Sequence, residues 1–197
     1  LDYKANRDAL TGLATRAVLE EKLEQAFAIC CQEGSAMAVV MCDVDHFKKV
    51  NDEYGHAVGD RALEGVAAAL ETHSRDGDLC CRYGGEEFTI LMEGARGKQA
   101  LAAAERLRHA IEAVRVDAGK ETLELTASLG VACFPETFVE NGADLVPLAD
   151  SALYESKRRG RNRSLLALGN GRFKNTQGRE LKGKGKTEEI EAPRLFV

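Results

Sequence analysis

The stretch Arg82-Tyr83-Gly84-Gly85-Glu86-Glu87-Phe88 places two glycines, two carboxylates and an aromatic residue between two apolar runs. Leu79-Cys80-Cys81 precedes it and Thr89-Ile90-Leu91-Met92 follows it. This pattern predicts two antiparallel strands joined by a tight turn at Gly84-Gly85. Because glycine has no Cβ and accepts positive φ, a ligand could approach the backbone there. The adjacent acids leave two interpretations open, a solvated turn or a cation site.

The composition is that of a globular protein. The chain has 197 residues, of which 44% are hydrophobic and 30% are charged, which is enough for one domain with its own core. No apolar run approaches the roughly 20 residues that span a bilayer. Leu1 begins no signal-peptide pattern, and we expect the chain to be cut from a longer protein.

The cysteines and the charges exclude some classes of protein. None of the six cysteines has CxxC spacing and two pairs are vicinal, so the sequence predicts neither a zinc site nor a disulfide framework but buried thiols in a reducing compartment. The net charge is −5, yet the segment from Lys157 to Lys186 carries eleven basic residues and one acid. Such a segment is either a solvated face or a binding surface for polyphosphate or nucleic acid.

A buried strand that ends in carboxylates comes early in the chain. A helix is predicted from about Thr15 to Gly34, followed by the apolar run Met37 to Cys42. This run leads directly into Asp43-Val44-Asp45. Carboxylates at the end of a buried strand are where α/β proteins hold metals and phosphates.

The remaining pattern predicts an α+β fold with a mixed central sheet flanked by helices. It mixes helices with a hairpin and lacks strict βαβ alternation. A glycine-rich bend before Asp60 begins one helix, and further helices and strands are expected over about 101–114, 123–132, 145–159 and 163–168. We expect residues 1–9 to end a linker helix, 10–168 to form the catalytic domain, and 169–197 to be a partly irregular extension whose residues 190–197 could add an edge strand.

Spacing brings charged groups together. Asp43 ends one strand and Glu86 lies at the hairpin tip; since neighbouring strands are about 4.8 Å apart, both can reach one hard cation. Oxygen ligands beside basic residues suit Mg²⁺ on a nucleotide better than Zn²⁺. Lys157 and Arg161 are i, i+4 on the last helix and can face one anion. The alternative is a basic helix C-terminus that complements the helix dipole.

These residues belong to a series of ordered motifs that resembles the GGDEF family of diguanylate cyclases. The resemblance covers about Asp8 to Ser164 and rests on many blocks in family order. They are Asp8-Ala9-Leu10-Thr11-Gly12-Leu13, Asp43 to Asp52, Tyr54-Gly55-His56 with Gly59-Asp60, Gly84 to Phe88, Thr126 to Val131, Ala149 to Tyr154, and Lys157 with Gly160-Arg161-Asn162.

The resemblance implies a five-stranded mixed sheet of the nucleotidyl-cyclase palm type and a defined reaction. Two GTP molecules, one per subunit, meet head to tail. Each 3′-hydroxyl attacks the α-phosphate of the other nucleotide, pyrophosphate leaves, and cyclic di-GMP forms. The resemblance implies a homodimer, formed through a missing N-terminal sensor or through product-linked contacts. It also implies a location in the bacterial cytoplasm, where this domain would be the soluble part of a larger sensor protein that could be anchored in a membrane. Nucleic acid is not an expected partner.

The resemblance also assigns roles to residues. Asp43, Glu86 and the Val44 carbonyl would hold Mg²⁺, with Mn²⁺ as the other candidate metal. Glu86 would also help to deprotonate the 3′-hydroxyl, while Glu87 supports either the metal or the fold. The substrate-binding residues would be His46, Phe47, Lys48, Asn51, His56, Asp60, Gly84, Gly85, Lys157 and Arg161.

Asn51 and Asp60 resemble the pair that reads guanine. A carboxylate that accepts from guanine N1–H and N2–H₂ rejects adenine, which offers an acceptor at the ring nitrogen. Relatives that make mixed cyclic dinucleotides carry a small hydroxyl residue in place of Asp60, so the resemblance favours cyclic di-GMP. The alternatives are a turn residue for Asn51 and a helix N-cap for Asp60. His56 is either a ligand contact or a loop-packing residue.

A second group resembles the family's inhibitory product site. Arg75-x-x-Asp78 lies shortly before the glycine pair, and Arg106 resembles its supporting position. Arginine pairs with phosphate and stacks on guanine, while Asp78 can accept guanine donors. The alternative is a surface ion pair that contributes about 0–1 kcal/mol.

The sequence departs from the family pattern at two places, and it allows three functional hypotheses. Ala14-Thr15-Arg16-Ala17 replaces the family's Asn-Arg-Arg, and Ser156 stands where alanine is usual. The hypotheses are an active, product-inhibited dimeric cyclase, a degenerate module that senses GTP or cyclic di-GMP without turnover, and a nucleic-acid-binding domain. The first ranks highest because the metal and guanine positions are intact, and the third ranks last because the basic tail lacks interleaved aromatics.

Overall fold

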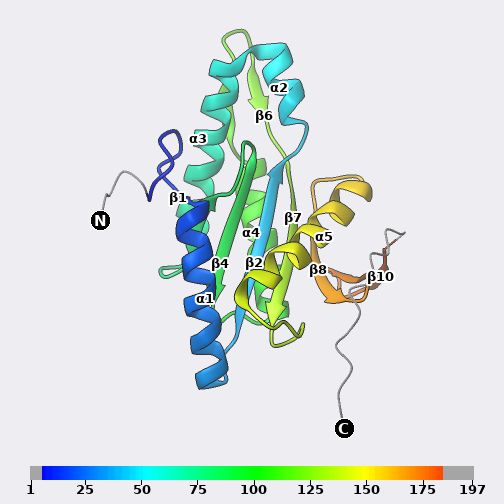
Figure 1. The fold of residues 1–197 in the computed structure, drawn as a ribbon. Helices are drawn as coiled ribbons and strands as arrows, with labels where there is room; N and C mark the ends of the chain where they lie inside the picture. Colours follow the sequence, from blue (N-terminus) through cyan, green and yellow to red (C-terminus); the bar gives the residue numbers. More distant parts are fainter. Residues whose placement is uncertain (1–5, 184–197) are drawn as a thin grey trace.

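One mixed sheet runs through the protein, and the computed structural model describes it within residues 6–183 (Figure 1). The elements of the N-terminal half are β1 (Ala14–Thr15), α1 (Arg16–Glu33), β2 (Met37–Val44), α2 (Phe47–Tyr54), α3 (His56–His73), β3 (Leu79–Arg82) and β4 (Glu87–Glu93). Those that follow are α4 (Gly97–Glu112), β5 (Arg115–Asp117), β6 (Thr122–Glu124), β7 (Ala127–Phe134), α5 (Leu145–Arg158), β8 (Ser164–Gly169), β9 (Arg172–Asn175) and β10 (Glu180–Lys182).

The strand order is β1-β3-β4-β2-β7-β8-β9-β10. β1 runs parallel to β3 and β7 parallel to β8, while the other neighbours are antiparallel. The predicted α+β fold with a mixed sheet is therefore confirmed. The expected five strands form its centre, from β3 to β8, and the sheet continues through β1 at one edge and the β9–β10 hairpin at the other.

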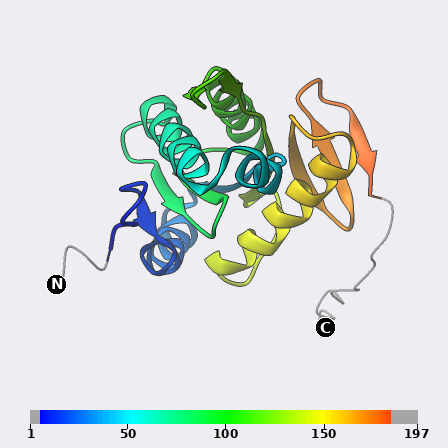
Figure 2. The same ribbon diagram turned by 90° about the horizontal axis from the view of Figure 1, so that it is seen from above.

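Helices cover both faces of the sheet, so the molecule has two cores (Figure 2). All eight residues of β2 are buried, as expected for a strand covered on both faces. Val40 and Cys42 pack with α3 and α4, whereas Val39 and Met41 pack with α1 and α5. Successive side chains of a strand point to opposite faces, so the apolar run Met37 to Cys42 feeds both cores at once.

Helix α5 lies very close to β7, and two small residues set that distance. A Cβ built at Gly130 would collide with the backbone of Ala149 and Leu153. Ser156, fully buried, donates a hydrogen bond of 2.8 Å to the Leu129 carbonyl oxygen. The serine that departs from the family pattern therefore attaches α5 to the sheet, one residue before Lys157.

Gly130→Ala is accordingly expected to destabilise the fold by about 1–3 kcal/mol, because the added methyl meets backbone that cannot rotate away. Chemical denaturation measures the change. Gly85→Ala is the matched control, since no heavy atom lies within 4 Å of a Cβ built there; a loss as large at Gly85 would contradict the packing argument.

Several boundaries differ from the sequence prediction. Residues 6–9 form a bend and a turn, with a bridge between Arg7 and Ala14, so the expected end of a linker helix is wrong for these four residues. The strand predicted over 123–132 is split, because β6 pairs with β5 in a separate small sheet. Gly34 ends α1 in the left-handed conformation, as expected.

The C-terminal extension is more regular than predicted. β9 and β10 form a hairpin on β8, and Phe173 is buried in the core that α1 and α5 cover. The edge strand suggested for residues 190–197 lies outside the described residues. Across residues 6–183, no helix is both long and apolar enough to span a bilayer.

Candidate active site

The site forms where the end of β2 meets the loop between β3 and β4. Asp43 is only 7% exposed and pairs in register with Glu87 of β4 and Ser128 of β7. The Val44 amide donates a 3.2 Å hydrogen bond to the Glu86 carbonyl oxygen. The central strand thus holds the hairpin that carries Glu86 and Glu87, and the predicted proximity of Asp43 to the hairpin is confirmed.

Lys157 at the end of α5 completes this cluster. Its Nζ lies 2.7 Å from Asp43 Oδ2, and its side chain is 32% exposed. The contact depends on how α5 is seated on β7, because the lysine is separated from Asp43 by more than a hundred residues in the sequence. One positive charge therefore faces several carboxylates.

Electrostatics in the cluster favour an additional cation. Burial raises the pKa of Asp43, and the charge of Glu86 raises it further, although Lys157 opposes both effects. Burial also raises the pKa of Glu87, with Asp43 and Asp150 adding to the effect. Carboxylates whose ionised forms repel each other at neutral pH are stabilised by a bound cation.

The donor set fits a divalent metal that is shared with a substrate. Among residues 6–183, no three His, Cys, Asp or Glu side chains are grouped to hold a metal by themselves. The set implied by the family resemblance needs only Asp43, Glu86 and the Val44 carbonyl. Mg²⁺ commonly takes one or two carboxylates and completes its shell with water and phosphate oxygens, so the residues present fit it.

The hairpin loop differs from the predicted tight turn. β3 ends at Arg82 and β4 begins at Glu87, and the amides of Tyr83 and Gly84 both donate to the Glu87 carbonyl oxygen, at 2.8 and 3.2 Å. Neither Gly84 nor Gly85 has positive φ, so that part of the glycine argument is wrong. A Cβ built at Gly84 would lie 2.6 Å from Glu87 Oε2, so glycine at this position leaves room for the Glu87 carboxylate where it lies. The space beside Gly85 is open.

An arginine that the sequence analysis did not assign fixes this loop. Arg82 donates to both carboxylate oxygens of Asp8 at 3.1 and 3.2 Å, and its Nε and a terminal nitrogen donate to the Gly85 carbonyl oxygen. Asp8 also accepts from the amide and hydroxyl of Thr11. The N-terminal turn and the loop of the site are therefore joined through one guanidinium group.

Asp8→Asn is expected to lower the free energy of unfolding by about 1 kcal/mol at neutral pH, since the pair with Arg82 is partly exposed. Burial alone would raise the pKa of Asp8, but the hydrogen bonds from Thr11 and Arg82 lower it below its usual value. A lowered folded-state pKa gives stability that is present at neutral pH and lost as the pH falls through that pKa. Denaturation of both proteins at neutral and acidic pH measures this. Asp76→Asn, at an exposed turn residue, is the control, and a difference that persists in acid would contradict the assignment.

Asn51 of α2 lies against α3 at Gly59, the residue before Asp60. A Cβ built at Gly59 would overlap Asn51 Oδ1, so the amide side chain lies against the α3 backbone next to Asp60. α3 begins at His56 with Gly55 as its N-cap. Asp60 is therefore not the N-cap, and Asn51 lies within α2 rather than in a turn. Asp60 and His56 are both exposed.

The first turn of α2 offers backbone donors beside the acids. His46 is its N-cap in the left-handed conformation, with φ of 58°. Phe47 is buried in the core, whereas the side chains of His46 and Lys48 are exposed. The first amides of a helix have no intrahelical partner. The position is consistent with the predicted anion-binding role of residues 46–48.

The ends of β2 and α5 correct one expectation and distinguish two neighbouring acids. Arg161 is not on the helix with Lys157: α5 ends at Arg158, and Arg161 follows in the left-handed conformation with φ of 63°. Asp45 does not share the environment of Asp43, because its oxygens accept from Thr126 Oγ1, Ser128 Oγ and the Asn162 amide. Asp45 is a structural residue that fixes the segment after α5.

The residues of the predicted inhibitory site lie around the end of α3. Asp78 Oδ2 accepts a 2.9 Å hydrogen bond from the Arg75 amide, and Arg106 on α4 donates twice to the His73 carbonyl oxygen. Within residues 6–183, the side chains of Arg75 and Asp78 form no ion pair. Arg75 is exposed.

Known proteins resemble this chain in sequence. The family model described as "Diguanylate cyclase, GGDEF domain" matches residues 5–163. The chain is 41% identical over 167 residues to diguanylate cyclase DgcP of Pseudomonas aeruginosa, covering 83% of this chain and 24% of that protein. It is 38% identical to diguanylate cyclase A of Treponema denticola, covering 71% of this chain and 37% of that protein. The chain thus spans well under half the length of these curated relatives.

Solved structures show the same fold. Diguanylate cyclase SiaD of Pseudomonas aeruginosa, solved in complex with its activator SiaC, is similar with a TM-score of 0.79 and 40% identity, over 83% of this chain and 63% of that one. The GGDEF domain of DgcB from Caulobacter crescentus, solved in complex with c-di-GMP, has a TM-score of 0.79 and 32% identity, over 85% of this chain and 96% of that one. With its ordered motifs, its mixed sheet and a family model that matches most of its length, the chain belongs to the GGDEF family.

Proposed function

We propose that this protein is a diguanylate cyclase that condenses two GTP molecules into cyclic di-GMP and two pyrophosphates. The observation that carries the proposal is the cluster of Asp43, Glu86 and Glu87 opposite Lys157, built on the end of β2. Relatives named diguanylate cyclases and a neighbour bound to c-di-GMP support it.

Each group in the cluster has a chemical task. A divalent ion, Mg²⁺ or Mn²⁺, would neutralise charge on the phosphates when held by Asp43, Glu86 and the Val44 carbonyl. Glu86 accepts the proton of the attacking 3′-hydroxyl. Lys157 and the first amides of α2 bind the β- and γ-phosphates, with Arg161 contributing from the segment after α5. Phosphoryl transfer depends chiefly on such positioning and charge neutralisation.

Guanine is read at the α2–α3 joint. Asp60 accepts from N1–H and N2–H₂ of the base, and Asn51, which lies against Gly59, offers an NH₂ donor group and a carbonyl acceptor. Exposed His56 lines the same wall. A site built to pair with these base donors rejects adenine, which leaves the carboxylate unpaired.

The reaction requires two copies of the domain. Each site holds one GTP, and the attacking hydroxyl comes from the nucleotide on the partner, so we propose a homodimer as the active form. We place the reaction in the bacterial cytoplasm; the thiols of residues 6–183 are all free, and most are buried.

Incubation with GTP and Mg²⁺, followed by chromatography of the products, tests the activity. Cyclic di-GMP and pyrophosphate are expected, with more product when a fused dimerisation domain raises the local concentration of the second site. If the forcibly dimerised protein binds GTP but makes no cyclic dinucleotide, the protein is a binding module instead.

Product inhibition is a separate part of the proposal. Arg75→Ala is expected to weaken inhibition by cyclic di-GMP about tenfold or more, because an exposed guanidinium that pairs with phosphate is lost. Initial rates at increasing product concentration measure the effect. Arg172→Ala, which removes an exposed arginine of β9, is the control; equal inhibition of the Arg75 variant and the wild type would refute the assignment of Arg75 and Asp78, with Arg106 in support.

A further inference from the structure

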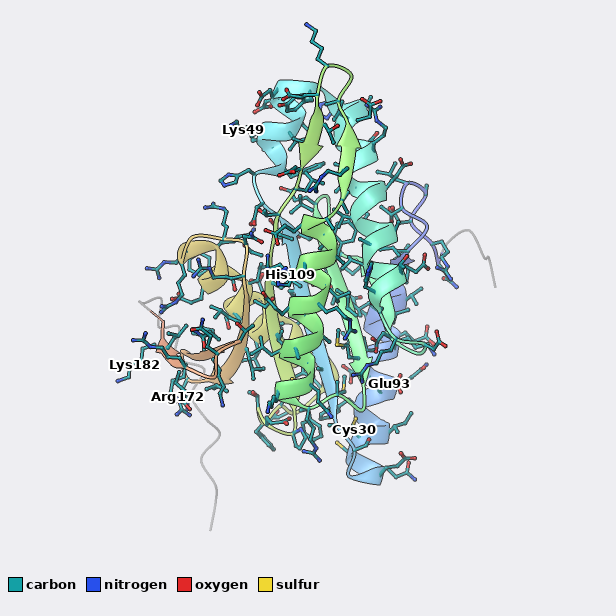
Figure 3. The ribbon with its side chains drawn as sticks, turned by 180° about the vertical axis from the view of Figure 1, so that it is seen from behind. Cys30, Lys49, Glu93, His109, Arg172 and Lys182 are labelled. Atoms are coloured by element: carbon teal, nitrogen blue, oxygen red, sulfur yellow. The ribbon has the colours of Figure 1, made fainter. Side chains whose placement is uncertain are left out.

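A cavity of about 470 Å³ lies under the β9–β10 hairpin, between α4, the end of α5 and β8. Figure 3 shows the hairpin, marked by Arg172 and Lys182, beside the helix that carries His109. Glu105 lines the cavity from α4, Ser164 from β8, and Arg159, Arg163, Arg179 and Asn175 from the surrounding segments. None of the residues that line it belongs to the candidate active site or to the predicted inhibitory site.

Two polar atoms in this cavity wall lack partners. Ser164 Oγ and Glu105 Oε2 are the buried side-chain oxygens within residues 6–183 that have no hydrogen-bond partner. Ser164 is 2% exposed. Glu105 binds Arg108 through its other oxygen at 3.0 Å. Buried polar groups are nearly always paired, so two unpaired oxygens in the wall of one cavity indicate groups that a bound molecule would satisfy.

The arginines that line the cavity differ in whether their charge is already paired with a carboxylate. Arg159 is already neutralised, with Glu155 at 2.6 Å, and it also donates to the Lys182 carbonyl oxygen. Arg163 uses only its Nε, which donates to the Arg161 carbonyl oxygen. Within the described part of the chain, neither Arg163 nor Arg179 has an ion-pair partner. Two uncompensated guanidinium groups at one cavity suit a phosphate, which they bind through paired N–H donors.

An inorganic anion alone would not satisfy the whole site. The Glu105 carboxylate accepts hydrogen bonds only, so it calls for a hydroxyl or amine donor on the same molecule. We propose that this cavity binds a small phosphate ester, with its phosphate on Arg163 and Arg179 and its hydroxyl or amine groups on Glu105 and Ser164. The volume lies in the range of small-molecule sites. Since both oxygens are covered, the lining side chains shift slightly when the ester enters.

Calorimetric titration with two probes, inorganic phosphate and glycerol 3-phosphate, tests the proposal on the whole chain. Glycerol 3-phosphate is expected to bind at least about tenfold more tightly, because it adds hydroxyl donors. The double variant Arg163→Gln/Arg179→Gln should lose at least about tenfold in affinity for both probes. Lys157→Met removes the cation of the active site and should leave the affinity for glycerol 3-phosphate unchanged. Loss of binding in Lys157→Met alone, or no binding of either probe to the wild type, overturns the proposal.

Ser164→Ala gives a second readout that a purely structural serine would not produce. Removing an unpaired buried hydroxyl is expected to raise the melting temperature of the unliganded protein. The same change should weaken glycerol 3-phosphate binding, since one partner of the ester is lost. A lower melting temperature together with unchanged binding would show that the hydroxyl serves the fold and would overturn its assignment to the cavity.

Discussion

Glu86→Gln is expected to lower cyclic di-GMP formation by at least about a thousandfold while GTP binding remains measurable. The amide keeps the size of the side chain but cannot take the proton of the attacking hydroxyl, and it loses the negative charge that a metal requires. Removal of a single group that stabilises developing charge commonly costs a hundredfold to a thousandfold in rate, and here two tasks are lost together. Base and phosphate contacts elsewhere in the site are untouched.

Single-turnover product analysis and GTP titration of the same sample separate the two effects. Glu93→Gln is the matched control, because this acid lies on the same strand β4 but at its far, exposed end. A Glu86→Gln protein that turns over at the wild-type rate would remove Glu86 from the catalytic role and leave Glu87 as the candidate base.

Asp43→Asn is expected to lower the turnover rate by about a hundredfold or more. The same substitution is expected to raise the melting temperature of the metal-free protein. The two effects have one origin. Burial, together with the charge of Glu86, holds the pKa of Asp43 above its usual value. The folded state therefore binds the proton more tightly than the unfolded state, and stability decreases as the pH rises through the unfolded pKa toward the folded one. Asparagine avoids that loss at neutral pH, although it also gives up the ion pair with Lys157.

Asp45→Asn is the control for Asp43→Asn, because it changes a buried carboxylate of the same strand end. Asp45 accepts three hydrogen bonds, and leaving buried donors unpaired costs about 1–3 kcal/mol. Its replacement should destabilise the protein, opposite in sign to Asp43→Asn. Adding Mg²⁺ should raise the melting temperature of the wild type and leave that of Asp43→Asn unchanged. Equal destabilisation by both substitutions would contradict the separate roles.

The elements with strong local signals could be predicted from the sequence. Residue spacing and chain stereochemistry alone predict three features: the apolar strand β2, the apolar faces of the helices, and the end of α1 at Gly34. Each of them depends on neighbours within a few positions. The ordered motifs also indicated the family, and the expected spacing of neighbouring strands predicted that Asp43 and Glu86 lie close together. The mixed sheet followed from the presence of a hairpin among helices.

Contacts between distant segments were decided only by the tertiary structure. Asp43 and Asp45 look equivalent in sequence, yet the strands and the segment that surround them leave one carboxylate facing Lys157 and occupy the other with three hydrogen bonds. Gly84 leaves room for the Glu87 carboxylate and does not have positive φ. Arg82 joins Asp8 to the loop across more than seventy residues. The β9–β10 hairpin and its cavity carry no strong local pattern. The position of the hairpin on β8 depends on packing and hydrogen bonds between segments that are distant in the sequence, which residue order alone does not reveal.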